Sequence, residues 1–166
     1  MMDNIPLITL LGGKRMKAKA NRHHTQWAGQ FGVAHELVRR GYLVAFTLGN
    51  APGTDLLCQS PEEKSFSLEV KTLSSRTYYL CQDHLQEPNE SRHFVFVFLP
   101  SSTEKRPEYY VFNNQQFLEV VEEQKELTKA SEAKRGKPYA DFSFGIAYKT
   151  IAKREFRDAW KRNLPK

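Results

Sequence analysis

Hydrophobic residues near the start of the chain follow helical spacing. Between residues 25 and 40 apolar side chains recur every three or four positions, which predicts a helix. Arg39, Arg40 and Gly41 indicate its end, because basic residues followed by glycine favour a helix C-terminus. The face expected to pack on the core consists of Trp27, Phe31, Ala34, Leu37 and Val38.

Strand patterns follow this helix. Residues 42–48, 54–58 and 65–73 predict three strands, separated by a turn rich in Gly and Pro and by a polar turn. Residues 93–99 are apolar at every position after the first, which fits a strand buried in the middle of a sheet. Two shorter strands are predicted over residues 77–80 and 109–112.

The second half of the chain predicts two further helices. The first spans residues 114–133, with an inward face of Phe117, Val120, Val121 and Leu127. The second covers residues 153–162 and presents Phe156 and Trp160 four positions apart on one side. Helices at both ends and strands between them predict an α/β fold, with a central mixed β-sheet flanked by helices.

A chain of 166 residues is long enough for one domain with its own core. We expect that single domain to span residues 25–166. Residues 1–24 show little apolar periodicity and predict a mobile basic N-terminal arm that includes the adjacent His23 and His24. A solvated tail without a ligand explains the arm equally well. Its basic residues are Lys14, Arg15, Lys17, Lys19 and Arg22.

Charge and composition bear on partner and location. The net charge of +6 favours a polyanion such as nucleic acid, although many small basic proteins bind none. No apolar stretch reaches the length of a membrane span, and the short apolar run near residue 10 precedes its basic residues, unlike a secretory signal. Only Cys58 and Cys81 are present, so a reduced, cytoplasmic setting is expected.

Candidate chemistry lies at Asp55 and at the triplet formed by Glu69, Val70 and Lys71. Alternation along residues 65–73 puts Glu69 and Lys71 on one face of the strand, with Val70 on the other. Other Glu-x-Lys triplets, at residues 62–64, 123–125 and 132–134, occur in a polar turn or in charge-rich helical segments. Asp55 opens the preceding strand, so a hairpin would bring its carboxylate beside that of Glu69.

Two converging carboxylates repel each other and would be stabilised by a hard divalent cation, Mg²⁺ or Mn²⁺. Such an ion could activate a water molecule for attack on a phosphodiester. Lys71 would orient the nucleophile and offset the charge of the transition state. The alternative is a surface ion pair between Glu69 and Lys71, with Asp55 serving only as a turn residue.

These residues also resemble a family. Asp55 ends the segment Pro-Gly-Thr-Asp and is followed along the chain by Glu69-Val70-Lys71, and this order resembles the motif of the PD-(D/E)XK nuclease superfamily. The segment from Gly29 to residue 42 is similar to that superfamily's first helix. The similarity covers residues 25–125 and lies nearest to small Holliday-junction-resolvase-like and endonuclease-like domains. It implies a restriction-endonuclease-like core and Mg²⁺-dependent hydrolysis of DNA. It also implies metal binding by Asp55, Glu69 and the Val70 carbonyl, with Lys71 as the catalytic lysine.

One position departs from that pattern. Family members often carry a Glu on the first helix that reaches the metal. At about 100° per residue, Gln30 falls at the edge of the inward face, whereas Glu36 falls opposite and should face solvent. We therefore expect Gln30 to complete the site through an amide, which can bind a metal or position water but contributes no negative charge.

Several other residues have two interpretations. Arg76 and Thr77, with Ser74 and Ser75, could contact phosphates, and Lys14 and Arg15 in the arm could do the same. The alternative is that residues 74–77 form a polar loop without a ligand. Tyr78 and Tyr79 could stack on bases or simply pack. Cys58, His84 and His93 are expected to be structural rather than catalytic.

The sequence therefore predicts a metal-dependent endonuclease acting on DNA. The alternative is a catalytically silent nucleic-acid-binding module or subunit with a nuclease fold, and a third candidate is a partner-binding subunit of a larger defence or repair complex. A homodimer would supply the two active centres needed to cut both strands at once.

Overall fold

The computed structural model describes residues 22–47, 53–139 and 144–166, and its main feature is a five-stranded sheet in the order β1-β2-β3-β5-β6. Strands β3 and β5 run parallel, and the other neighbouring pairs are antiparallel. This confirms the α/β class and the mixed central sheet. The strands are β1 (Leu43–Phe46), β2 (Leu56–Gln59), β3 (Ser65–Leu73), β5 (Arg92–Phe98) and β6 (Glu108–Phe112).

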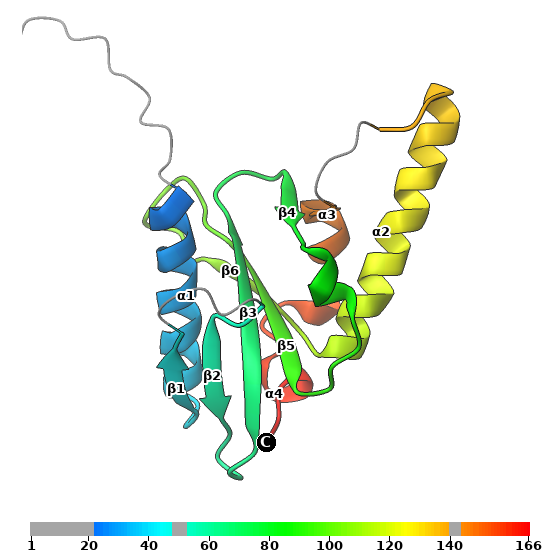
Figure 1. Ribbon diagram of the computed structural model, residues 1–166. Coiled ribbons are helices and arrows are strands. Elements are labelled where there is room, and N and C mark those ends of the chain that lie inside the picture. The colour runs from blue at the N-terminus through cyan, green and yellow to red at the C-terminus, as the bar shows by residue number, and fades with distance from the viewer. Residues whose placement is uncertain (1–21, 48–52, 140–143) are drawn as a thin grey trace, which may run out of the picture.

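Helices α1 (Arg22–Val38) and α2 (Asn114–Arg135) lie on opposite sides of this sheet (Figure 1). A second, two-stranded sheet pairs β4 (Tyr78–Leu80) with β7 (Gly145–Ala147). No helix within the described residues is both long and apolar enough to cross a membrane. The remaining elements are short: the 3₁₀ turns η1 (Asp83–Gln86) and η2 (Arg154–Phe156), and the helices α3 (Tyr148–Ile151) and α4 (Trp160–Asn163).

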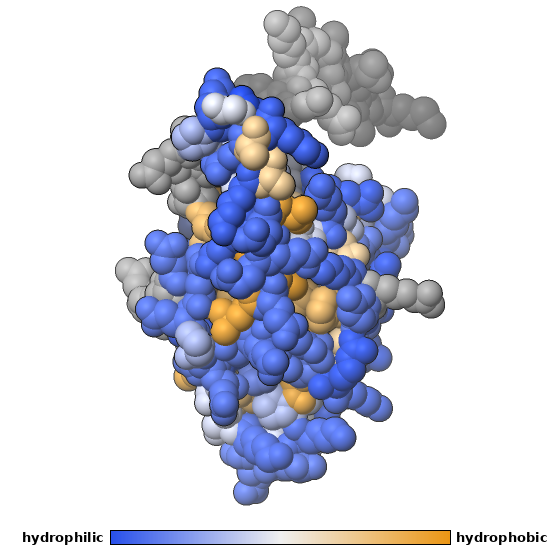
Figure 2. Space-filling view, turned by 90° about the vertical axis from the view of Figure 1, so that its right-hand side faces the viewer, coloured by the Kyte–Doolittle hydropathy of each residue, from blue (hydrophilic) through white to orange (hydrophobic). Residues whose placement is uncertain are grey.

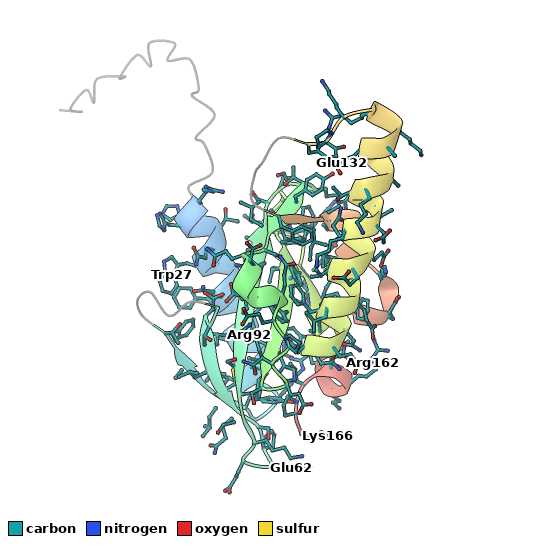
Figure 3. All side chains as sticks on the ribbon, turned by 45° about the vertical axis from the view of Figure 1, so that its right-hand side comes forward. Trp27, Glu62, Arg92, Glu132, Arg162 and Lys166 are labelled. Carbon is teal, nitrogen blue, oxygen red and sulfur yellow. The ribbon has the colours of Figure 1, made fainter. Side chains whose placement is uncertain are left out.

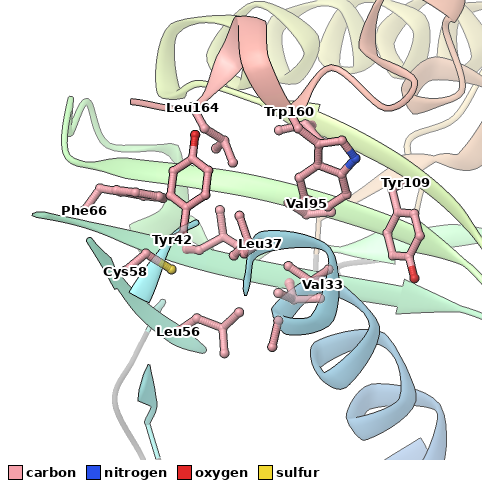
Figure 4. Close-up of a cluster of buried hydrophobic side chains, with 14 of the residues drawn as sticks. Val33, Leu37, Tyr42, Leu56, Cys58, Phe66, Val95, Tyr109, Trp160 and Leu164 are labelled. Carbon is pink, nitrogen blue, oxygen red and sulfur yellow. The ribbon is translucent and has the colours of Figure 1, made fainter. Parts of the chain in front are cut away.

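The central strand β5 explains why the core has two layers. Val95 and Val97 point toward α1, whereas Phe94 and Phe96 point toward α2, and all four are at most 1% exposed. Successive side chains of a strand face opposite ways, so a strand covered on both sides is apolar at every position. The α1-side cluster also contains Val33 and side chains of the C-terminal segment (Figure 4), with members that include Leu37, Leu56, Phe66, Leu68, Trp160 and Leu164.

Helix α2 begins and ends at clear local signals. Asn113 and Gln116 form a reciprocal capping box at its start, and Gly136 closes it with a left-handed φ of 68°. Phe117, Val120 and Val121 are buried as predicted. Leu127 is 44% exposed, so its predicted inward position is wrong. The side of the molecule on which α2 lies is largely hydrophilic, with scattered hydrophobic patches (Figure 2).

The buried face of α1 differs from the predicted one. Ala34 and Leu37 are buried, but Trp27, Phe31 and Val38 are 37%, 56% and 59% exposed. The reason lies at Gly29, where an added Cβ would come 1.9 Å from Oγ1 of Thr72, so the glycine side of the helix faces β3. Trp27 lies at the outer side of α1 (Figure 3) and its ring stacks on that of Phe31. Both rings also make tilted contacts with Phe46 of the edge strand β1.

Glu36 corrects a second expectation about α1. It was predicted to face solvent, yet it is only 5% exposed. Arg40, one turn later, donates to its Oε2 at 2.5 Å, and Arg106 donates to Oε1 at 3.3 Å. A carboxylate can be buried when cations accompany it, and Arg106 lies too far along the chain for helical geometry to reveal it.

Helix α1 also begins at Arg22, three residues earlier than predicted, so residues 22–24 belong to the helix and not to the arm. Residues 1–21, which carry Lys14 and Arg15, lie outside the described part of the chain, as do Leu48 and Pro52.

The predicted helix over residues 153–162 is wrong. The chain forms η2 and α4 instead, interrupted at Asp158, whose φ of 51° does not continue a helix. Asp158 donates its N–H to the carbonyl of Tyr109 in the edge strand β6, where the chain crosses from one layer to the other. Phe156 therefore packs on Phe112 on the α2 side, whereas Trp160 joins the α1-side cluster.

Candidate active site

Asp55 is held against β3 at the point where β2 begins. Leu56 pairs with Leu68, so one further step of the antiparallel register places Asp55 opposite Glu69. The N–H of Asp55 donates to the Leu68 carbonyl at 2.9 Å, and its carbonyl accepts from Thr47 at the end of β1. Gly53, with a φ of 74°, supplies the left-handed residue of the turn before it. The predicted hairpin is confirmed, and it brings Asp55 to Glu69.

The side chain of Asp55 is fixed by two donors. Its Oδ2 accepts from the backbone N–H of Val70 at 2.7 Å, and its Oδ1 accepts from Nε2 of Gln30 at 2.5 Å. Gln30 is 5% exposed, so its predicted orientation toward the sheet is confirmed. An amide can donate to a carboxylate, whereas a glutamate at this position would repel it unless protonated. Gln30 therefore acts on Asp55 as a hydrogen-bond donor.

Glu69 and Lys71 share the other face of β3, as the alternation predicts. Nζ of Lys71 lies 2.5 Å from Oε1 of Glu69. Glu69 is only 6% exposed, which argues against an ordinary surface ion pair. Charge-assisted contacts of this kind are stronger when shielded from water, and they fix both side chains.

The surroundings of Asp55 disfavour its ionised form. Burial and then the neighbouring Glu69 carboxylate raise the pKa of Asp55 to about 6, against the opposing effects of the Val70 N–H, Lys71 and Gln30. The ionised form of Asp55 is therefore destabilised near neutral pH, and an added cation would relieve this.

These residues line the floor of one open cleft. The cleft has a volume of about 740 Å³ and lies between the first turns of α1 and strand β4. Asp55, Glu69, Val70 and Lys71 all line it, so the structure brings these four predicted residues to one place. Gln30 does not line the cleft and is joined to them through its hydrogen bond to Asp55. The other residues that line the cleft include Arg22, Thr25, Gln26, Ser74, Ser75, Thr77, Tyr78 and Leu80.

The other candidate residues divide between the cleft and the core. Thr77 lines the cleft, while the guanidinium of the exposed Arg76 lies over the rings of Phe98 and Tyr148. Tyr79 is 1% exposed and donates to the Val97 carbonyl, so packing explains it.

Cys58 and His93 are also buried, in keeping with their structural interpretation. Burial raises the pKa of the Cys58 thiol to about 12 and lowers the pKa of His93.

Sequence reasoning missed the cleft residues on α1. Arg22 had been assigned to the arm, and Gln26 had no role. The available signal was helical spacing, since Gln26 precedes Gln30 by four residues and so lies on the same side of the helix. Leu80 was also missed, because only the fold turns the outer face of β4 toward this site.

Asp55 and Glu69 could together hold a hard divalent cation. Within the three described segments, no group of three or more His, Cys, Asp or Glu side chains is placed to hold a metal ion. Mg²⁺, however, is usually bound through only one or two carboxylates and keeps several waters. Asp55 and Glu69 provide two carboxylates, and a cation beside them would offset the burial and the carboxylate repulsion that raise the pKa of Asp55.

Comparisons with known proteins add no relative: no family model, no curated protein and no solved structure matches this chain. The case for function therefore depends on the geometry of the cleft.

Proposed function

We propose that this protein is a metal-dependent endonuclease that hydrolyses DNA phosphodiester bonds at a PD-(D/E)XK-type site. The observation that carries the proposal is the placement of Asp55, Glu69 and Lys71 in one cleft, with the half-buried Asp55 beside a second carboxylate. The order of these residues on a hairpin and the mixed sheet around them also support a restriction-endonuclease-like core.

In this proposal Asp55, Glu69 and the Val70 carbonyl would hold Mg²⁺ or Mn²⁺. When bound, such an ion polarises a phosphodiester oxygen and makes water a nucleophile at neutral pH. Lys71 orients the attacking water and offsets the charge that builds on the phosphate oxygens. Gln30 holds the Asp55 carboxylate in position through its amide N–H.

DNA as substrate and a cytoplasmic setting belong to the same proposal. The net charge of +6 favours a polyanion, and Arg22 places positive charge at the cleft. Cys58 and Cys81 are both buried free thiols, which suits a reducing compartment. Because one cleft holds one centre, cutting both strands together would require a homodimer.

A plasmid-nicking assay tests the proposed activity. Supercoiled DNA should be nicked with Mg²⁺ or Mn²⁺ and remain intact in EDTA. Glu69→Gln should lower the rate at least about 100-fold, because it removes a charged metal ligand. Glu62→Gln is the matched control, since Glu62 belongs to a similar triplet, is exposed, and lies at the turn at the other end of β3 (Figure 3). Metal-independent nicking, or equal rates for Glu69→Gln and wild type, would refute the proposal.

The second candidate is a catalytically silent nucleic-acid-binding module or subunit. The observation that favours it is Gln30, an amide where a nuclease of this type often has an acid. It predicts tight DNA binding without cleavage in any divalent metal. A partner-binding subunit of a defence or repair complex predicts weak DNA affinity in isolation, so a DNA-binding measurement beside the nicking assay separates all three.

A further inference from the structure

The candidate cleft has two chemically different walls. The α1 wall carries the polar side chains of Arg22, Thr25 and Gln26 at the N-terminal end of a long helix. The β4 wall consists of Tyr78, Tyr79 and Leu80, of which Tyr78 and Leu80 are 58% and 48% exposed. The floor between the walls holds Asp55, Glu69 and Lys71.

Strand β4 is anchored so that Tyr78 and Leu80 stay exposed at the cleft. Tyr79 is buried and donates its hydroxyl to the Val97 carbonyl at 3.2 Å, while Tyr78 pairs with Ala147 of β7. The N–H of Tyr148 donates to the Thr77 carbonyl at 2.8 Å, which fixes the start of the strand. Since successive residues of a strand face opposite ways, burial of Tyr79 forces Tyr78 and Leu80 outward. Their exposure follows from the fold.

An exposed aromatic ring beside a nuclease centre offers a stacking surface for a base. Stacking accounts for roughly tenfold or more in affinity per base and depends little on base identity. In a continuous duplex each base already stacks on its neighbours, so its face is not available to a tyrosine. Only an unpaired or unstacked nucleotide can use such a ring.

The opposite wall suits the backbone of the same strand. Arg22 supplies a cation, and the N-terminal end of α1 carries the positive pole of the helix dipole. A single strand presents phosphates along one edge and bases along the other, which matches a cleft that is polar on one side and aromatic on the other.

We propose that Tyr78, supported by Leu80, stacks on an unpaired nucleotide, so that the preferred substrate is single-stranded or branched DNA and not continuous duplex. This inference rests on the proposed function and names the substrate class of that same site. Tyr78 is here a specificity-determining residue, and the chemical step remains with Asp55, Glu69 and Lys71.

Equilibrium binding in EDTA tests this without requiring catalysis. Fluorescence anisotropy would compare a single strand, a flapped duplex and a plain duplex of the same sequence. Wild type should bind the first two about tenfold more tightly than the plain duplex. Tyr78→Ala should remove this preference, and Tyr78→Phe, which keeps the ring, should retain it. Phe31→Ala is the matched control, because Phe31 is equally exposed at 56% but does not line the cleft.

Equal binding of wild type to all three DNAs would overturn the inference. An equal loss for Tyr78→Ala on all three would do so as well, because it would indicate a general or structural role. Failure of metal-dependent nicking leaves this readout intact, so the substrate preference and the proposed nuclease activity can fail separately.

Discussion

Replacing Lys71 with alanine is expected to slow DNA cleavage at least about 100-fold. Removing one preorganised group that stabilises transition-state charge commonly costs 10²- to 10³-fold in rate, roughly 3 to 4 kcal/mol. Lys71 has the required preorganisation, since its Nζ lies 2.5 Å from Oε1 of Glu69 at the floor of the cleft. The loss should appear in the rate and not in DNA affinity, because one cation among many basic residues contributes little to phosphate binding.

Single-turnover nicking at saturating protein measures this rate directly. The control is Lys64→Ala, which removes the lysine of another Glu-x-Lys triplet, where Lys64 pairs with Glu62 at 3.4 Å in an exposed turn. Lys71→Arg tests whether charge alone suffices, since a guanidinium keeps the positive charge but has a different shape and donor geometry from an ammonium. A rate for Lys71→Ala within threefold of wild type would remove Lys71 from the mechanism.

Replacing Asp55 with asparagine is expected to abolish cleavage and yet stabilise the metal-free protein above pH 6. The pKa of Asp55 is about 6 in the folded state, above the 3.8 of a free aspartate side chain, so folding favours its protonated form. As pH rises from about 4 to 6 the folded state has to release a proton that the unfolded chain has already lost. The free energy of unfolding of wild type therefore falls across this window and levels off above it.

Asparagine avoids that penalty and can keep both hydrogen bonds. Its oxygen can accept from the Val70 N–H, and its amide can donate to Gln30 once the Gln30 amide turns over. After allowance for solvent screening the expected gain is about 1 to 2 kcal/mol at pH 8, falling to near zero at pH 4.

Chemical denaturation in EDTA across this pH range measures the difference. Added Mg²⁺ should stabilise wild type and have little effect on Asp55→Asn, because only wild type has both carboxylates. Asp83→Asn, on the 3₁₀ turn η1 and away from the cleft, is the control. If Asp55→Asn is less stable than wild type at pH 8, the ionised Asp55 carboxylate is not destabilised by its surroundings.

The core of the candidate site was predictable because it depends on local geometry. The alternation along β3 placed Glu69 and Lys71 on one face, and a short hairpin limits where Asp55 can lie. Helical periodicity placed Gln30 toward the sheet for a similar reason. Each of these inferences uses residues that are close in sequence or joined by a tight turn.

The features that escaped prediction depend on contacts between distant segments. The rotation of α1 follows from the approach of Gly29 to Thr72, and the burial of Glu36 depends on Arg106, 70 residues away. The break at Asp158 follows from the hydrogen bond to Tyr109 where the chain passes the edge of β6. The β4 wall of the cleft, which includes Tyr78, likewise depends on the pairing of β4 with β7. The sequence of β7 shows no strand pattern from which this pairing could be predicted.

The central claim is that Asp55 and Glu69 together form a site for a divalent cation. Anomalous diffraction from crystals soaked in Mn²⁺ tests it most directly. We expect a peak between the two carboxylates, within ligand distance of the Val70 carbonyl, that disappears in crystals of Glu69→Gln. Absence of any peak there in wild type, or an undiminished peak in Glu69→Gln, would contradict the account.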